Sequence, residues 1–368
     1  MANFPVRPMD AVVALYSDGA AELSEAIIAS LSCAVFGPGS VTRAGLPQKL
    51  FSRFTHRVLK LTTKRRKADD QSGDTSTYCN PILERSGHPY ARALLTSSST
   101  AEESVIEGGD HMNGPYMMIV PEILKLGTTW DRIFLNSVQG KDVQLRFIWE
   151  TKATYQEAKV RLDKGQNVRI KAVAAGTGLS MILAYDRLMR DGYDPARITA
   201  RITDREKSNT EKSRRILAKL STTRGGGASD SSGGGISAET EDIFGEMPGS
   251  ESEAAYDVVT AVGILEYFQG FTCQTTERSL DLSQPEEEAH AVHLAQKLSQ
   301  MTADDGSLIT NTCRPQASTR ILELFGKRFD YRTRTNLSEL LRTVKFRNPR
   351  LMGTGNIYDV KVYEKGPH

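Results

Sequence analysis

The stretch that decides the fold is Val168-Arg-Ile-Lys-Ala-Val-Ala-Ala-Gly-Thr-Gly-Leu-Ser180. It begins as an apolar run rich in β-forming residues, which is typical of a buried strand, and it continues into a Gly-x-Gly turn. Directly after the turn, residues 179–190 carry apolar side chains at helical spacing, and Gly192 with Pro195 ends that pattern. The sequence therefore predicts a strand, a tight turn and a helix in that order.

The turn has the composition of a ligand-binding turn. Glycine lets the backbone approach a ligand closely, and the N-terminus of the following helix adds unpaired N–H groups and the positive end of a dipole. Gly176 and Gly178 alone are a weak signal, because many strand-to-helix turns contain glycine and bind nothing. A second strand is predicted over residues 198–203, and Asp204 follows at its carboxyl end, where an open α/β sheet places the acid that binds ribose hydroxyls.

Strands and helices alternate through the rest of the chain. Beyond Asp204 the patterns predict helices over residues 206–220, 289–301 and 337–344, and strands over 256–262, 307–312 and 357–363, with a short strand near Lys345. Asp304-Asp305-Gly306 is expected to close the second of these helices. This alternation predicts an α/β fold with a doubly wound, mostly parallel sheet and helices on both faces, preceded by a mainly helical N-terminal region.

Residues from about 150 to 365 resemble the class I S-adenosylmethionine-dependent methyltransferase family. The resemblance rests on five parts in the right order, which together are more specific than any one alone. These are the turn at 173–180, the acid at 204, the segment Glu241-Asp-Ile-Phe244, the strand and loop at 256–267, and the turn and strand at 305–310.

The resemblance implies S-adenosylmethionine as cofactor. The positions it assigns to cofactor binding are Ala174, Gly176, Thr177, Gly178, Asp204, Asp242, Ile243 and Gly263. The chain departs from the family pattern at Ala174, where relatives usually have an acid that contacts the methionine amino group, and at Ser180, where they usually have a third glycine.

A dinucleotide is the competing cofactor, because a Gly-x-Gly turn with a downstream acid also describes the Rossmann fingerprint. That fingerprint requires a third glycine three residues after the second, and Met181 stands there. Its acid is also expected about 20 residues on, nearer than Asp204. The sequence favours S-adenosylmethionine over NAD(P).

The acceptor is indicated by Gly263-Ile-Leu-Glu-Tyr267, which is similar to a loop of methyltransferases that act on lipids and small natural products. It follows a predicted strand at the carboxyl edge of the sheet, where this fold class places ligands. We expect Glu266 to accept a proton from, or orient, a small-molecule or lipid acceptor, and Tyr267 to wall the cavity. The alternatives are that Glu266 caps a neighbouring backbone and Tyr267 is core, and that the chain is a non-catalytic binding module of methyltransferase fold.

Composition sets further limits. The chain has 368 residues, of which 39% are hydrophobic, and a net charge of +2, so it reads as globular and requires no nucleic acid partner. Its four cysteines form no C-x-x-C pair, which favours free thiols and a cytoplasmic location. No apolar run is long enough to span a membrane, and residues 1–10 lack a signal-peptide pattern. His290 and His293 have a spacing that can hold a metal, but without a third ligand we expect no metal site.

The predicted organisation is an N-terminal helical cap or substrate region over residues 1–150 and a cofactor-binding domain over 151–368. The cap has a predicted helix over residues 21–36. Residues 50–67 pair an amphipathic stretch with a basic run; a solvated helix end is expected, and peripheral contact with anionic lipid is the alternative. Residues 224–235 are rich in glycine and serine and are predicted to be a flexible loop that is dispensable for folding. The oligomeric state stays open.

Overall fold

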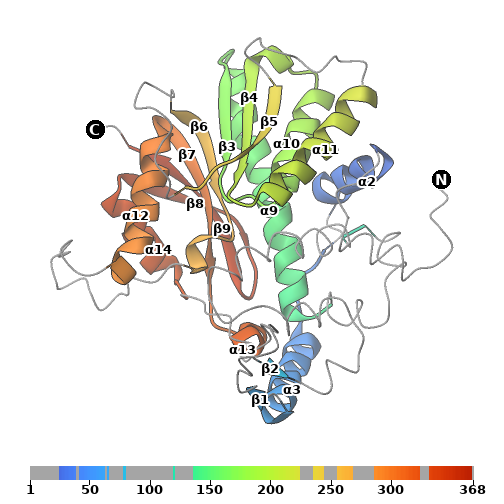
Figure 1. Ribbon diagram of the computed structural model, residues 1–368, viewed down its shortest axis with the longest axis vertical. Coiled ribbons are helices and arrows are strands. Elements are labelled where there is room, and N and C mark those ends of the chain that lie inside the picture. Colours follow the sequence, from blue (N-terminus) through green and yellow to red (C-terminus); the bar gives the residue numbers. More distant parts are fainter. Residues whose placement is uncertain are drawn as a thin grey trace, which may run out of the picture.

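A computed structural model describes residues 25–38, 41–62, 64–65, 78–79, 119–120, 136–223, 235–243, 255–267, 286–323 and 331–366. Its centre is a sheet of seven strands in the order β5-β4-β3-β6-β7-β9-β8 (Figure 1). The strands from β5 to β7 are parallel, and β9 is antiparallel to both of its neighbours. The strands are β3 (Val168–Ala172), β4 (Ile198–Asp204), β5 (Gly235–Thr240), β6 (Tyr256–Ala261), β7 (Thr302–Cys313), β8 (Phe346–Thr354) and β9 (Tyr358–Lys365).

Helices cover both faces of the sheet (Figure 1). One face packs against α9 (Val138–Asp163), α10 (Leu179–Arg190) and α11 (Lys207–Thr223), with α2 (Glu25–Phe36) outside them. The other face packs against α12 (Glu286–Met301) and α14 (Arg334–Thr343). The prediction of a doubly wound, mostly parallel α/β fold is confirmed.

The burial of β3 explains why this stretch decides the fold. Val168, Ile170 and Ala172 are no more than 1% exposed and belong to the hydrophobic cluster on the α9 and α10 side. Val173 and the β6 residue Val259 belong to the cluster on the α12 side. Apolar and basic residues alternate along β3, and the buried Lys171 is accommodated by its ion pair with Glu241 at 2.8 Å.

Helix α9 leads into the sheet from the N-terminal side. The Ser137 side chain caps it by accepting a hydrogen bond from the Gly140 N–H at 3.1 Å. Phe147 and Ile148 are buried in the cluster beside β3. The helix crosses the predicted domain division at residue 150, so the residues on either side of that division share one continuous helix.

The remaining elements are short or peripheral. They are α3 (Leu46–Thr62), β1 (Lys64–Arg65), β2 (Tyr78–Cys79), the 3-10 helices η1 (Pro195–Arg197) and η2 (Leu265–Tyr267), and α13 (Ala317–Glu323). Helix α3 packs against α13 and α9 (Figure 1). No helix within the described ranges combines the length and apolar character needed to cross a membrane.

Most predicted elements are present, and the differences have physical reasons. Helix α10 has its predicted bounds, and β4 extends one residue further, to Asp204. Asp304-Asp305-Gly306 was expected to close a helix; that expectation is wrong, because these residues lie within β7. They form an irregularity there, since Tyr256 pairs with Thr302 whereas Val258 pairs with Ser307.

Two predicted segments have different bounds in the structure. The short strand near Lys345 is the nine-residue β8, which gains its length by pairing with β9. The predicted loop ends one residue earlier than expected, because Gly235 is the first residue of β5; residues 224–234 lie outside the described ranges. Of the basic run at 64–67, Lys64 and Arg65 form β1.

Candidate functional site

The turn between β3 and α10 has three residues in the left-handed region. Their φ angles are 47° for Ala174, 57° for Gly176 and 61° for Gly178. Successive residues that alternate in handedness turn their N–H groups into a common concavity, which is a favourable seat for an electron-rich group. Ala174, Ala175 and Gly176 are partly exposed, whereas Thr177 and Gly178 are buried. The first part of the turn is therefore the part open to a ligand.

Gly178 is required by the packing beneath the turn. A Cβ atom at this position would lie 2.5 Å from the Cγ2 atom of Ile202 on β4. The N-terminus of α10 can therefore lie against β4 only because residue 178 has no side chain. The buried Thr177 is held from the other side, since its carbonyl oxygen accepts a hydrogen bond from the Ser213 hydroxyl at 2.9 Å.

Asp204 fastens the turn to the end of β4. Its Oδ2 atom accepts a hydrogen bond from the Gly176 N–H at 2.7 Å, and its Oδ1 atom accepts from the Glu206 N–H at 2.9 Å and from the Asn209 amide at 3.2 Å. The Asp204 residue is 7% exposed, and three of the about four lone-pair sites of its carboxylate are occupied. The structure thus brings together the glycine turn and the acid that the sequence singled out.

The segment after β5 lies beside Asp204. The Glu241 N–H donates to the Asp204 backbone oxygen at 3.0 Å. Asp242 is exposed, and Ile243 packs, like Ala174, against the cluster on the α12 side of the sheet. The three predicted cofactor-binding segments around 174–178, 204 and 242–243 therefore lie at the carboxyl ends of adjacent strands.

Gly263 lies where β6 ends, between β7 and α9. Its N–H donates to the Asn311 side-chain oxygen at 2.6 Å, and its φ angle is 85°. A Cβ atom here would lie 3.1 Å from the guanidinium nitrogens of Arg146. The position is partly exposed, so this loop also borders the open part of the site.

Glu266 is buried in an ion pair. Its side chain is 1% exposed; Oε1 accepts from Arg146 Nη1 at 3.0 Å, and Oε2 accepts from the Asn311 amide at 3.3 Å. Burial raises the pKa of Glu266, and Arg146 opposes that rise. Both carboxylate oxygens are thus engaged by the protein, and the role of Glu266 as a general base stays a prediction. Tyr267 ends η2, and its side chain lies outside the described atoms.

Two charged residues on the inner face of α9, Arg146 and Glu150, were not predicted from the sequence. Oε1 of Glu150 accepts hydrogen bonds from the Ser180 hydroxyl at 2.9 Å and the Thr260 hydroxyl at 3.5 Å. Burial raises the pKa of Glu150 to about 7. The signal available in the sequence was a pair of opposite charges one helical turn apart among the apolar residues Phe147 and Ile148.

These residues surround the switch point of the sheet. The strand β3 pairs with β4 on one side and with β6 on the other, and the chain winds outward from it in both directions. Ligands of open α/β sheets bind outside the carboxyl ends of the strands at such a point. The turn, Asp204 and Glu150 therefore define the candidate site.

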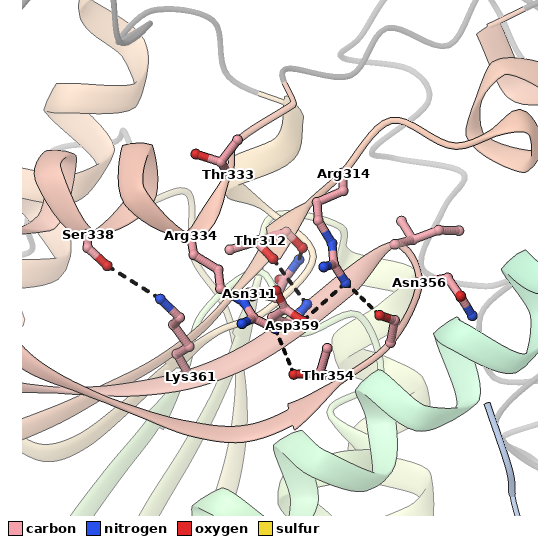
Figure 2. A network of polar contacts seen from close by, with 12 residues as sticks. Asn311, Thr312, Arg314, Thr333, Arg334, Ser338, Thr354, Asn356, Asp359 and Lys361 are labelled. Atoms are coloured by element: carbon pink, nitrogen blue, oxygen red, sulfur yellow. Dashed lines mark hydrogen bonds and ion pairs between the residues drawn. The ribbon is translucent and has the colours of Figure 1, made fainter.

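A second polar network connects the antiparallel strands and has a structural role (Figure 2). The fully buried Asp359 on β9 accepts from Arg334 at 2.7 Å and from Arg314 at 3.1 Å, and its N–H donates to the Thr312 hydroxyl at 3.1 Å. Two arginines neutralise one buried carboxylate, which ties the ends of β7, β9 and α14 together. Burial, with Arg334 nearby, lowers the pKa of Lys361.

The described residues contain no group of three His, Cys, Asp or Glu side chains that could hold a metal ion. Among the described cysteines, Cys33 and Cys313 are free thiols.

The fold is a Rossmann-like α/β fold with a seven-stranded, mostly parallel sheet, as the sequence predicted. No protein-family model and no curated protein matches the sequence.

Solved structures of similar fold include several methyltransferases. The CMeT domain of the citrinin polyketide synthase is 11% identical, with a TM-score of 0.43 over 98% of this chain and 96% of that one. Magnesium protoporphyrin IX methyltransferase from Synechocystis PCC 6803, solved with bound S-adenosylhomocysteine, is 12% identical, with a TM-score of 0.38 over 61% of this chain and 87% of that one. The 1,6-didemethyltoxoflavin-N1-methyltransferase of Burkholderia thailandensis is 15% identical, with a TM-score of 0.34 over 59% of this chain and 79% of that one.

Proposed function

We propose that this protein binds S-adenosylmethionine and transfers its methyl group to a small-molecule or lipid acceptor. The observation that carries the proposal is the partly exposed turn at the switch point of the sheet, fastened to Asp204 through the Gly176 N–H at 2.7 Å. Asp204 is the group expected to meet the ribose hydroxyls, and Asp242 and Ile243 are expected to border the adenine.

The chemistry suits a site with little acid–base machinery. The cofactor supplies a methyl group that its sulfonium already activates. The residues of this chain then have to orient the acceptor in line with that methyl and exclude water, which is catalysis by positioning. The residues best placed to border the acceptor are Gly263 and the partly exposed Val262, at the end of β6.

Calorimetric titration with S-adenosylhomocysteine tests the cofactor assignment. Asp204→Asn removes the charge and one of the oxygens that receive hydrogen bonds from the turn. We expect affinity to fall about ten- to a hundredfold, which corresponds to about 1.5–3 kcal/mol for a hydrogen bond to a charged group. Asp194→Asn is the control, because Asp194 caps η1 just before β4, at the opposite end of that strand from Asp204. Unchanged affinity in the Asp204 variant would remove the basis of the proposal.

A non-catalytic binding module is the second candidate. It is favoured by Ala174, which provides no carboxylate in the turn, and by the burial of Glu266 in its ion pair. A protein that binds S-adenosylhomocysteine yet transfers no labelled methyl group to extracted small molecules or lipids would fit this candidate. Methyl transfer to an extract component would exclude it.

A further inference from the structure

We propose that Glu150 provides a carboxylate subsite for a primary ammonium group, and that its ligand is the methionine ammonium of the cofactor. The inference rests on the proposed function and adds to it a residue from α9, outside every motif that carries the family resemblance.

Glu150 is held against the candidate turn from two sides. Its Oε1 atom accepts from the hydroxyl of Ser180, in the first turn of α10, at 2.9 Å, and from the hydroxyl of Thr260 on β6 at 3.5 Å. The Thr260 carbonyl oxygen in turn accepts the Val173 N–H at 2.9 Å. The carboxylate therefore lies at the point where β3 and β6 part, on the α9 side of the turn.

The second oxygen of this carboxylate is available to a ligand. Within the part of the chain that the structure describes, Oε2 of Glu150 receives no hydrogen bond. The residue is partly exposed, so a small cationic group can approach it. A carboxylate with one oxygen fixed by hydroxyls and the other open is well oriented for an ammonium donor.

The turn itself has no other carboxylate for this purpose. Ala174 stands two residues before Gly176, and Asp204, which accepts three hydrogen bonds from the protein, is the acid assigned to the ribose. Glu150 is thus the acidic side chain that the structure brings to this turn with an open oxygen.

The electrostatic surroundings of Glu150 are compatible with a cationic ligand. Burial raises the pKa of Glu150 to about 7, and Arg146, one turn earlier on α9, opposes that rise. The groups that face Glu150 from α10 and β6 are the uncharged hydroxyls of Ser180 and Thr260. An ammonium group next to the carboxylate favours its ionised form, so ligand binding near neutral pH should release protons.

The test compares two ligands that differ by the amino-acid moiety. Glu150→Gln should lower the affinity for S-adenosylhomocysteine about ten- to a hundredfold, which is the loss expected for a hydrogen bond to a charged group. The affinity of the same variant for 5′-methylthioadenosine, which has no ammonium group, should stay within about twofold of the wild-type value. Glu157→Gln, the same change two turns along α9, is the control. Calorimetry of the wild type in buffers of different ionisation enthalpy should also show proton release at pH 7 that the Glu150 variant lacks.

The outcomes separate this inference from the proposed function. If the wild type fails to bind S-adenosylhomocysteine, both are wrong. If the wild type binds it and Glu150→Gln binds equally well, the subsite alone is wrong. If the variant weakens both ligands to the same extent, Glu150 has a structural role and the subsite is again overturned.

A separate surface carries a second inference: we infer that α3 docks on an anionic lipid bilayer. The apolar side chains that this helix exposes are Leu46 (68%), Leu50 (52%), Phe51 (47%), Phe54 (66%) and Leu61 (85%). At 100° per residue they occupy one side of the helix, whereas the buried Ser52 and Leu59 lie on the opposite side.

Basic residues follow one edge of this exposed apolar surface. Lys49, Arg53, Arg57 and Lys60 are all exposed and fall within a narrow arc of the helix. Apolar side chains flanked by lysine and arginine are the pattern of a helix that lies in the interface of an anionic membrane. The charge complementarity decides in favour of anionic lipid over a second copy of this chain, because two copies would bring like charges together.

The position of α3 relates this surface to the candidate site. Helix α13 begins shortly after the carboxyl end of β7, and α3 packs against it (Figure 1). The surface is therefore on the side of the carboxyl edge, where the site opens, and a lipid acceptor would reach the site from this direction.

Co-sedimentation with vesicles tests the surface. We expect binding to vesicles that contain phosphatidylglycerol, and at least tenfold weaker binding to pure phosphatidylcholine. Phe54→Glu should abolish the binding, and Arg53→Gln/Arg57→Gln should lower it roughly 25-fold, at about fivefold for each charge. Val160→Glu is the matched control, since Val160 on α9 is likewise exposed, at 52%.

Equal binding to both vesicle types, or none to either, would overturn the assignment. So would concentration-dependent self-association that Phe54→Glu abolishes in the absence of vesicle binding, because that result identifies a second copy as the occupant.

Discussion

At the scale of single residues, Gly178 meets two requirements, a left-handed backbone and the absence of a Cβ atom, whose contributions to stability can be measured separately. Its φ angle is 61°, and a Cβ atom would lie 2.5 Å from Ile202. Gly178→Ala should lower the free energy of unfolding by about 2–4 kcal/mol, from left-handed strain and overpacking together. Gly192→Ala has the strain alone, because its φ is 86° and nothing lies within 4 Å of the added atom. Chemical denaturation should show a clearly smaller loss for Gly192→Ala; equal losses would mean that contact with Ile202 is unimportant.

Glu150 should make the stability of the ligand-free protein depend on pH. Its folded-state pKa is about 7 against an ordinary value of 4.5, so the folded protein favours the protonated form. That contribution is fully present below pH 4.5 and is lost as the pH rises through 7. As the pH rises from 4.5 to 7, the free energy of unfolding of Glu150→Gln should therefore increase relative to wild type by about 1–3 kcal/mol. Above pH 7 this difference should level off. A pH-independent difference in unfolding free energy would contradict this.

At this scale the sequence could predict only residues that a local pattern of strand, turn or helix identifies. Gly176, Gly178 and Asp204 follow from strand, turn and helix patterns, and the structure joins Gly176 to Asp204 by a hydrogen bond. The ion pair between Arg146 and Glu266 spans 120 residues, and no local pattern specifies it. The sequence therefore indicated a reactive group at a strand end and gave no sign that Glu266 is buried in an ion pair.

At the scale of elements, the ion pair of Arg146 and Glu266 fixes α9 to the loop after β6. Arg146→Met should cost about 3–5 kcal/mol of unfolding free energy, because it leaves the Glu266 carboxylate buried without its cation. The double variant with Glu266→Gln should lose markedly less than the sum of the two single changes. Denaturation of all four proteins measures this coupling, and additive losses would show that the two side chains act independently.

The same set of proteins tests the catalytic role predicted for Glu266. If the residue is an anchor, Glu266→Gln lowers the melting temperature and leaves methyl transfer per folded molecule nearly unchanged. A fall in turnover by about a hundredfold or more at unchanged stability would instead restore the general-base prediction.

Element bounds were predicted best where the local pattern and the packing agree. Helix α10 and strand β4 have apolar periodicities that match the faces they bury. Strand β7 was predicted too short, because Asp304-Asp305-Gly306 has the composition of a turn but lies within the strand, at an irregularity in its pairing with β6. Strand β8 owes most of its length to hydrogen bonds with β9, and its own sequence does not indicate it.

At the scale of the whole molecule, α9 connects the N-terminal part of the chain to the sheet. Its first half contains the buried Phe147, the ion pair of Arg146, and Asp142, which accepts hydrogen bonds from the Ile357 N–H and, at 3.3 Å, from Asn356. A chain that begins at residue 151 loses all of these contacts, whereas one that begins at residue 136 retains them. We expect the shorter chain to lack a cooperative thermal transition and the longer one to keep it. Similar melting curves for both would support a division at residue 150.

The insertion of β9 between β7 and β8 leaves β8 at one border of the sheet, and this border is poorly suited to recruit another strand. Pro349 has no N–H to donate, Asn348 is left-handed with a φ of 51°, and the pairing register shifts between Arg347 and Arg350. Arg347 and Arg350 are both exposed, so identical copies of this border would repel each other. The antiparallel insertion thus protects the protein from polymerising through this border, even though it places a nine-residue strand there.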